Sequence, residues 1–182
     1  MIVCAGNNET FKFATPVGVG LIDSAINLTR LCLFDKPDFL LFVGSAGSYG
    51  KHHIFDILES KTATNIELGY FQKLSYTPID NIVDEDVSRG TSDKIIVNCS
   101  NYITTNIENA NTFLNAGISL ENMEFYSVLK VAKEFNIPAA GVFIVTNYCN
   151  ANAHDDFIKN HKKSKELLIK FIKEKYKDLK HD

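Results

Sequence analysis

The chain has 182 residues, of which 45% are hydrophobic and 23% are charged, as is typical of one soluble globular domain. Its formal net charge of −3 gives no overall attraction to nucleic acid or to an anionic membrane. The four cysteines form no CxxC pair and no apolar run has membrane-spanning length, so we expect no zinc site, disulfide framework or membrane anchor. We therefore predict a single cytoplasmic domain over residues 1–182.

The first part of the chain alternates short apolar runs with one helical pattern. Residues 1–5 are rich in β-formers and residues 11–17 alternate in polarity, so both are predicted as strands. Apolar spacing predicts a helix over 21–34, which Pro37 ends. The residues that set this spacing are Ile22, Ala25, Ile26, Thr29 and Leu33. The continuous apolar run 39–44 is typical of a strand covered on both faces.

The rest of the chain continues the alternation. Strands are predicted within 54–68, 94–100 and 139–147, and an amphipathic helix over 122–136 is ended before Pro138. The polar stretch 78–93 is expected to be a surface excursion. A long final helix over 154–179 carries one apolar side, made of Leu168, Phe171, Ile172 and Leu179. Strands that alternate with helices indicate an α/β fold with a mostly parallel sheet between helices.

A glycine-rich stretch follows the strand 39–44, where the chain reads "FVGSAGSYG". A backbone with so few side chains suggests that a small ligand lies against it. In open α/β sheets, ligands bind beyond the carboxyl ends of strands, and "IIVNCSNY" and "FIVTN" also end two strands in polar residues. The alternative is a tight strand-to-helix connection that needs glycine dihedral angles.

Five segments, in order, resemble the purine nucleoside phosphorylase and nucleosidase superfamily, which includes methylthioadenosine/S-adenosylhomocysteine nucleosidase. They are "MIVCAGNNE", "GVGLIDSAINL", "KPDFLLFVGSAGSYG", "ENMEFYSVLKVAKEFNIP" and "GVFIVTN". The resemblance implies a three-layer nucleoside phosphorylase-like α/β fold, with a central mixed, mostly parallel sheet flanked by helices. The chain is a short member, which lacks a hairpin region between Glu9 and Thr15 and a helix before Lys94.

The resemblance also implies how a purine nucleoside is held. Glu124 would accept hydrogen bonds from the ribose 2′- and 3′-hydroxyls, and Met123 would lie against the sugar. Tyr102 would stack on the purine, with Ile103 beside it. The glycine-rich segment, made of Gly44, Ser45, Ala46 and Gly47, would face the sugar and the nucleophile. Without the resemblance, the residues alone favour a helix-start glutamate for Glu124 and an ordinary half-buried tyrosine for Tyr102.

The nucleophile determines the reaction class. Phosphorylases of this superfamily bind phosphate through arginines, one of them just before the glycine–serine pair, where this chain has Phe42. Arg30 and Arg89 lack the expected context, and phosphate without a positioned guanidinium loses its strongest partner. The nucleosidases use a first-loop carboxylate to activate water, and Glu9 matches it. Hydrolysis is therefore predicted over phosphorolysis, with a solvated loop glutamate as the alternative role of Glu9.

One catalytic position departs from the family. The aspartate that polarises purine N7 matches Asn147, which cannot transfer a proton but can pair with N7–H and O6 of a 6-oxopurine. We therefore expect a preference for 6-oxopurine nucleosides. Phe125, where the family has a small residue, also departs from the pattern. A homologue that binds a purine or a protein without catalysis is the rival hypothesis.

No cofactor and no metal are expected, because His52 and His53 lack a further ligand cluster. The lysines of 159–180 alternate with acidic residues, which favours a solvated helix face over a nucleic-acid surface. The expected small partners are the purine nucleoside and, for the alternative reaction, phosphate. Family members are oligomers in which a neighbouring subunit helps to close the site, so a homodimer or higher homo-oligomer is expected.

Overall fold

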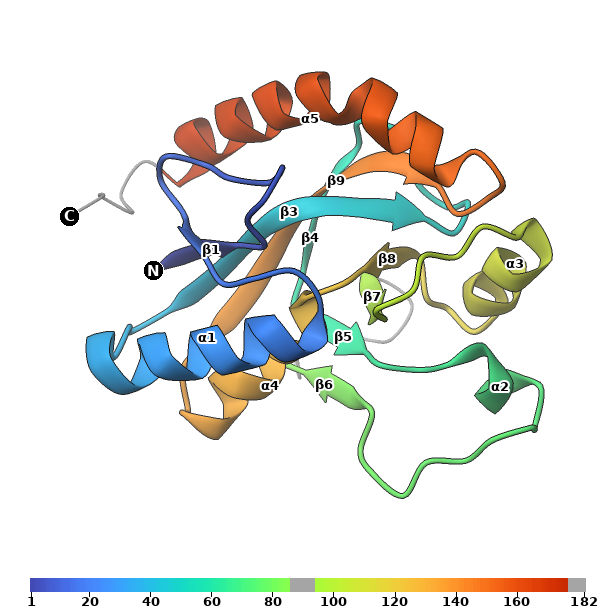
Figure 1. The fold of residues 1–182 in the computed structure, drawn as a ribbon, viewed down its shortest axis with the longest axis horizontal. Helices are drawn as coiled ribbons and strands as arrows, with labels where there is room; N and C mark the ends of the chain where they lie inside the picture. The colour runs from blue at the N-terminus through green and yellow to red at the C-terminus, as the bar shows by residue number, and fades with distance from the viewer. Residues whose placement is uncertain (86–93, 177–182) are drawn as a thin grey trace.

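The computed structural model describes residues 1–85 and 94–176, which form a nine-stranded mixed sheet flanked by helices (Figure 1). This confirms the predicted α/β fold. The strands are β1 (Ile2–Cys4), β2 (Thr15–Pro16), β3 (Leu40–Ser48), β4 (Ile57–Ser60), β5 (Thr62–Thr64), β6 (Ile82–Asp84), β7 (Ile96–Cys99), β8 (Leu120–Asn122) and β9 (Ala139–Tyr148). The helices are α1 (Leu21–Asp35), α2 (Leu68–Phe71), α3 (Ile107–Asn115), α4 (Phe125–Glu134) and α5 (Ala153–Lys175).

The two long strands β3 and β9 form the centre of the sheet. They run parallel and in register from Leu40↔Ala139 onward, with one irregularity between Ala46 and Gly47. Strand β4 pairs antiparallel with the other edge of β9. Both long strands are continuous apolar runs because both of their faces are covered.

The second edge of β3 is shared by two strands. Near its start, Leu41 and Phe42 pair with β1, and at its end Gly47 and Ser48 pair with β8. Within the described part of the chain, residues 43–46 have no strand beside them on this edge. The backbone polar groups of this gap therefore need partners from side chains or ligands.

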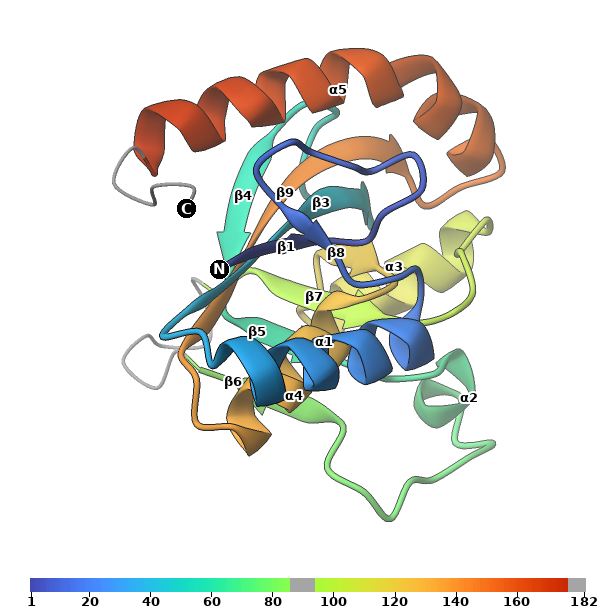
Figure 2. The ribbon, with the colours of Figure 1, turned by 60° about the vertical axis from the view of Figure 1, so that its left-hand side comes forward.

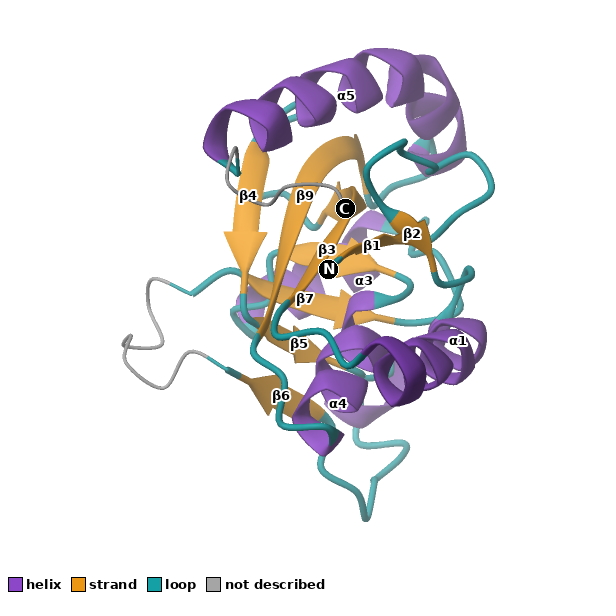
Figure 3. Ribbon diagram, turned by 90° about the vertical axis from the view of Figure 1, so that its left-hand side faces the viewer, coloured by secondary structure: helices purple, strands orange, loops and turns teal. Residues whose placement is uncertain are grey.

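Helices cover the two faces of the sheet with separate cores. Figures 1 and 2 show α5 along one face and α1 with α4 on the other, and the side view in Figure 3 shows the sheet between them. Along β3 the side chains alternate: Leu41 and Val43 pack in the core beneath α5, whereas Leu40 and Phe42 pack in the core with α4. This period of two is expected of a strand.

Helix α1 is confirmed, but the face that the sequence suggested as apolar points away from the core. Its buried residues are Ser24, Leu28 and Cys32, whereas Ile22 is 67% exposed and Leu33 is also exposed. The helix carries apolar residues on two sides. The side with Leu28 and Cys32 packs in the core with α4, which leaves Ile22, Ile26 and Leu33 on the surface.

Two further differences concern segment ends. The glycine-rich stretch predicted as a loop continues β3 to Ser48, because β9 pairs with it over its full length. Of the strand predicted over 11–17, only β2 forms, and Phe11 instead packs beneath α5.

Leu179 and residues 86–93 of the polar excursion lie outside the described residues. None of the described helices is long and apolar enough to cross a membrane.

Candidate active site

A cavity of about 340 Å³ lies beside the gap in the β3 edge. Six parts of the chain line it: the loop after β1, Val19 just before α1, the second half of β3, Ile103 in the loop after β7, the junction of β8 with α4, and the region from the end of β9 to the first turns of α5. Its polar lining residues are Asn7, Asn8, Glu9, Ser45, Glu121, Asn122, Glu124, Asn147 and His154. These segments meet at the carboxyl ends of β1 and β9, where open α/β sheets bind ligands.

Seven of the ten residues predicted for the site line this cavity. They are Glu9, Ser45, Gly47, Ile103, Met123, Glu124 and Asn147. The other three, Gly44, Ala46 and Tyr102, lie outside its lining. The structure therefore brings seven of the predicted residues together around one cavity, while the other three need another explanation.

Glu9 fills one half of the β3 gap. The backbone N–H of Ser45 donates to Glu9 Oε1 at 3.0 Å, in place of the strand that is missing there. A tight turn, in which Glu9 N–H donates to the Gly6 carbonyl at 2.9 Å, directs the glutamate back toward the sheet. Burial raises the pKa of the Glu9 carboxyl, while the Ser45 hydrogen bonds and the positive charges of His161 and Lys165 oppose this rise.

Asn122 fills the other half of the gap. Its Nδ2 donates to the Ser45 carbonyl at 3.0 Å, and its Oδ1 accepts from the N–H groups of Glu124 and Phe125 at 2.8 and 2.9 Å. One amide side chain thus joins β3 to the first turn of α4. This role of Asn122 was not predicted from the sequence, although an asparagine just before a helix is a recognised capping signal.

Glu124 is buried at the start of α4, where Asn122 links its backbone N–H to Ser45. Its Oε1 accepts a hydrogen bond from Gly20 N–H at 3.0 Å, which connects the start of α1 to the site. Burial raises the pKa of Glu124 to about 7, and the nearby charge of Glu9 adds to the rise. The hydrogen bond from Gly20, together with those from Asn122 and the Met123 backbone, opposes this rise in pKa.

Asn147 is nearly fully buried in the wall formed by β9. Its Oδ1 accepts from the Thr146 hydroxyl at 2.8 Å and its Nδ2 donates to the Tyr148 carbonyl at 3.2 Å. Each side of the amide keeps one unused position, an acceptor on Oδ1 and a donor on Nδ2. A Cβ at Gly47 would lie 3.1 Å from Asn147 Nδ2, so the glycine keeps the amide accessible.

Gly44 and Ala46 serve the fold rather than the cavity lining. A Cβ at Gly44 would come within 2.9 Å of the Phe42 ring and 3.2 Å of Glu9 Oε2. The absence of a side chain at residue 44 thus makes room for the glutamate. Ala46 is buried in the core beneath α4. The glycine-rich stretch is bare because neighbouring protein groups occupy the space as well as because Gly47 borders the cavity.

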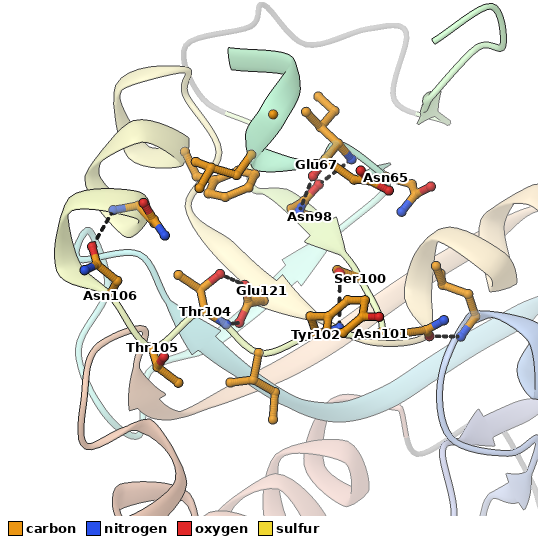
Figure 4. A pocket seen from close by; sticks show the side chains of 17 residues that line it. Asn65, Glu67, Asn98, Ser100, Asn101, Tyr102, Thr104, Thr105, Asn106 and Glu121 are labelled. Atoms are coloured by element: carbon orange, nitrogen blue, oxygen red, sulfur yellow. Dashed lines mark hydrogen bonds between the residues drawn. The ribbon is translucent and has the colours of Figure 1, made fainter. Parts of the chain in front are cut away.

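Tyr102 borders a second, wider cavity of about 700 Å³, which Figure 4 shows. The ring is 83% exposed, so the structure does not enclose it as a stacking partner. Two hydrogen bonds fix its loop: Leu21 N–H donates to Asn101 Oδ1 at 3.0 Å, and Thr104 N–H donates to Glu121 Oε1 at 2.9 Å. Ile103 lies between these anchors and lines both cavities.

Glu121 also lines both cavities and was not predicted from the sequence. In addition to the Thr104 backbone, the hydroxyls of Thr104 and Tyr49 donate to Oε2, and Cys149 Sγ lies 3.8 Å from Oε1. Four donors occupy the acceptor positions of this carboxylate. Glu121 therefore holds in place the loop that carries Ile103 and Thr104.

The start of α5 completes the wall with Ala153, His154 and Phe157. From the sequence, His154 was predicted only as part of the start of the last helix, because its place beside Glu9 depends on the packing of α5 over the sheet. Among the described residues, no group of three or more His, Cys, Asp or Glu side chains is arranged to hold a metal ion.

The chain matches a known protein family and is similar to solved structures of known proteins. The model of the phosphorylase superfamily matches residues 2–175, which confirms the resemblance carried by the five segments. No curated protein sequence gives a significant match. The chain is similar to 5′-methylthioadenosine/S-adenosylhomocysteine nucleosidase from Helicobacter pylori with butyl-thio-DADMe-Immucillin-A, at 17% identity and a TM-score of 0.81, over 98% of this chain and 97% of that chain.

Two other solved structures extend the comparison. Futalosine hydrolase of Helicobacter pylori is similar at 17% identity and a TM-score of 0.81, over 98% of this chain and 97% of that chain. S-adenosylhomocysteine nucleosidase from Streptococcus pyogenes, in complex with 5-methylthiotubericidin, is similar at 14% identity and a TM-score of 0.72, over 90% and 78%. At these identities the likeness establishes a shared fold.

Proposed function

The chain belongs to the phosphorylase superfamily, and on this premise we propose that it cleaves the N-glycosidic bond of a purine nucleoside by hydrolysis. The observation that carries the proposal is the arrangement of two carboxylates around the backbone of one residue, Ser45. Ser45 N–H holds Glu9 directly, and the Ser45 carbonyl accepts from Asn122, which also caps the turn that carries Glu124. Two acidic groups from distant segments thus line one cavity.

The two carboxylates have different partners, which suits them to different tasks. Glu124 would accept the ribose 2′- and 3′-hydroxyls, and its ionised form would gain most from two such donors. Glu9 would take a proton from the attacking water as general base. Met123 lines the same wall and offers an apolar surface to the sugar.

Water is favoured over phosphate as the nucleophile. Of the cavity residues that the structure describes, none is an arginine. Arg30 borders a separate surface pocket with Pro16 and Phe34, and Phe42 packs in the core against Phe125 and Phe143. A phosphate dianion would therefore meet the carboxylates Glu9 and Glu124 without a guanidinium to balance its charge.

The base preference rests on Asn147. Once N7 of a departing 6-oxopurine has taken a proton from water, the free acceptor and donor positions of Asn147 match N7–H and O6, so the pair is satisfied as the base leaves. Adenine would need the amide reversed and would receive no proton from it. The proposed substrates are therefore hypoxanthine or guanine nucleosides.

A nucleoside panel tests this function. The protein is incubated with inosine, guanosine, adenosine and 5′-methylthioadenosine, each with and without phosphate, and free base and sugar products are quantified. Free ribose released at a rate independent of phosphate, fastest from the 6-oxopurines, is the expected result. Ribose 1-phosphate as the main product would identify phosphorolysis instead, and no cleavage of any nucleoside would favour a non-catalytic purine-binding role.

A further inference from the structure

A third, very small cavity lies behind Glu9, on the side toward α5. Its volume is about 10 Å³. Glu9 and Ser45 line both this cavity and the cavity of about 340 Å³, so the glutamate forms part of the wall between these two. The helix contributes His161, Ser164 and Lys165 to the small cavity. Glu9 therefore has a substrate-facing side and a side that faces only protein.

The Ser164 hydroxyl indicates what the small cavity holds. The residue is 2% exposed, and its Oγ is buried without a hydrogen-bond partner among the described residues. An unpaired buried hydroxyl is unfavourable, and a polar cavity of this size accommodates one water molecule. A single water would satisfy Ser164 and can reach the neighbouring carboxylate of Glu9.

The same cavity brings two basic side chains to Glu9. His161 and Lys165 are four residues apart on α5 and so lie on one face of the helix. Lys165 is also fixed near the Phe11 ring, with Nζ 5.5 Å from its centroid. Both residues lower the pKa of Glu9 against the effect of burial. These positive charges balance the charge of Glu9 in a site that also holds a second buried acid, Glu124.

We propose that His161, Ser164 and Lys165 form a cationic, hydrated support behind Glu9 that keeps its carboxylate ionised and oriented as the base. They are positioning residues, because they line the small cavity and not the cavity of about 340 Å³ in which the substrate would bind. The other titratable groups around Glu9 are Glu124, Cys4 and His154. The inference rests on the proposed function, since it assigns Glu9 the role of base.

The acidic limb of the pH profile tests the support. In Lys165→Met a positive charge beside Glu9 is lost, so the carboxyl binds its proton more readily and the acidic limb of kcat/KM should move upward by roughly one pH unit. Lys165→Arg should keep the wild-type limb. Lys162→Met removes the same charge from an exposed position on the same helix and should leave the limb in place. Equal shifts in Lys165→Met and Lys162→Met would overturn the proposal.

Titration of Glu9 separates this proposal from the proposed function. The Glu9 carboxyl can be followed by NMR of protein with ¹³C-labelled glutamate, with Glu9→Gln used to assign the signal. If no nucleoside is cleaved but Lys165→Met still raises the Glu9 midpoint, the proposed function fails and the support stands. If nucleosides are cleaved but neither the limb nor the midpoint moves, the support alone is wrong. A crystal structure should also show one ordered water at Ser164 Oγ, and a dry cavity would contradict the hydrated arrangement.

Discussion

Glu124 has conflicting effects on folding and on the proposed binding of a diol. Burial raises its pKa to about 7 from 4.5, so the folded protein retains a proton that the unfolded chain has released between these pH values. The stability contributed by this group therefore falls as pH rises through that window. The charged form that would bind the ribose is the form that the empty site disfavours.

Glu124→Gln should reveal both effects in one variant. We expect kcat/KM to fall by an amount equivalent to roughly 1.5–3 kcal/mol, because the charge-assisted part of the diol contact is lost. At pH 8 the free energy of unfolding should rise, by up to about 3 kcal/mol, and the gain should disappear below pH 4.5. Denaturant unfolding at several pH values measures this.

Glu134→Gln is the control, because that residue is exposed at the end of the same helix. It should change neither quantity. A Glu124→Gln variant that turns over substrate at the wild-type rate would remove Glu124 from the site.

Asn147 sets the second residue-level prediction. Asn147→Asp supplies a group that can carry a proton to N7, so the ratio of adenosine to inosine cleavage should rise, mainly through kcat. The ratio of kcat values for the two nucleosides measures the effect. Asn150→Asp makes the same chemical change just beyond β9 and should leave the ratio unchanged. A wild-type protein that already prefers adenosine would contradict the role given to the amide.

At the level of elements, Asn122 joins three of them. It belongs to β8, caps the first turn of α4 and replaces a strand neighbour for β3. Asn122→Ala should lower the free energy of unfolding by roughly 1–3 kcal/mol, since it leaves backbone groups in a buried region without partners.

Asn106→Ala removes an exposed cap at the start of α3 and should cost about 1 kcal/mol or less. Equal losses in the two variants, measured by denaturant unfolding, would mean that Asn122 acts as an ordinary helix cap. A larger loss in Asn122→Ala is expected because its effect reaches β3.

The elements that could be predicted from the sequence are those with a pattern of their own. The apolar runs of β3 and β9 and the periodicity of α4 and α5 needed no tertiary information. Strand β8 is different, because "LEN" carries no β pattern and is held extended by its position between β3 and β7. Helix α3 was not predicted, although Asn106, which caps its start, is a residue type that signals a helix start.

For the site, local motifs located Glu9, Ser45, Glu124 and Asn147 in one cavity. What they missed depends on packing between distant segments. Glu121 is placed by its hydroxyl donors, and His161 and Lys165 approach Glu9 only because α5 crosses the sheet. Tyr102 was matched by its neighbours in sequence, which cannot report that its ring stays exposed.

At the level of the whole molecule, exposed apolar side chains occur on both sides of the Leu21–Asn101 hydrogen bond. Ile22 and Ile26 lie on α1, and Tyr102 and Ile103 lie on the loop beside the site. Apolar surface of this kind is typical of an interface. We propose that a second copy of the chain covers it and helps to close the site.

Light scattering coupled to size-exclusion chromatography tests this association. The wild-type protein should elute as a dimer or a larger homo-oligomer, and the double variant Ile22→Asp, Ile26→Asp should shift it toward the monomer. Phe34→Asp introduces the same charge at the far end of α1, where the side chain is also exposed, and should leave the assembly intact. A monomeric wild-type protein would contradict the proposed interface.

The gap in the edge of β3 has a consequence for how such a site can diverge in evolution. Ser45 holds Glu9 through its N–H and the α4 turn through its carbonyl, and both groups belong to the main chain. These two contacts would survive a change of side chain at residue 45, which would remove only the additional hydrogen bond from the Ser45 hydroxyl to Glu9. The main-chain link between Glu9 and the turn that carries Glu124 can thus be inherited while the surrounding loops vary.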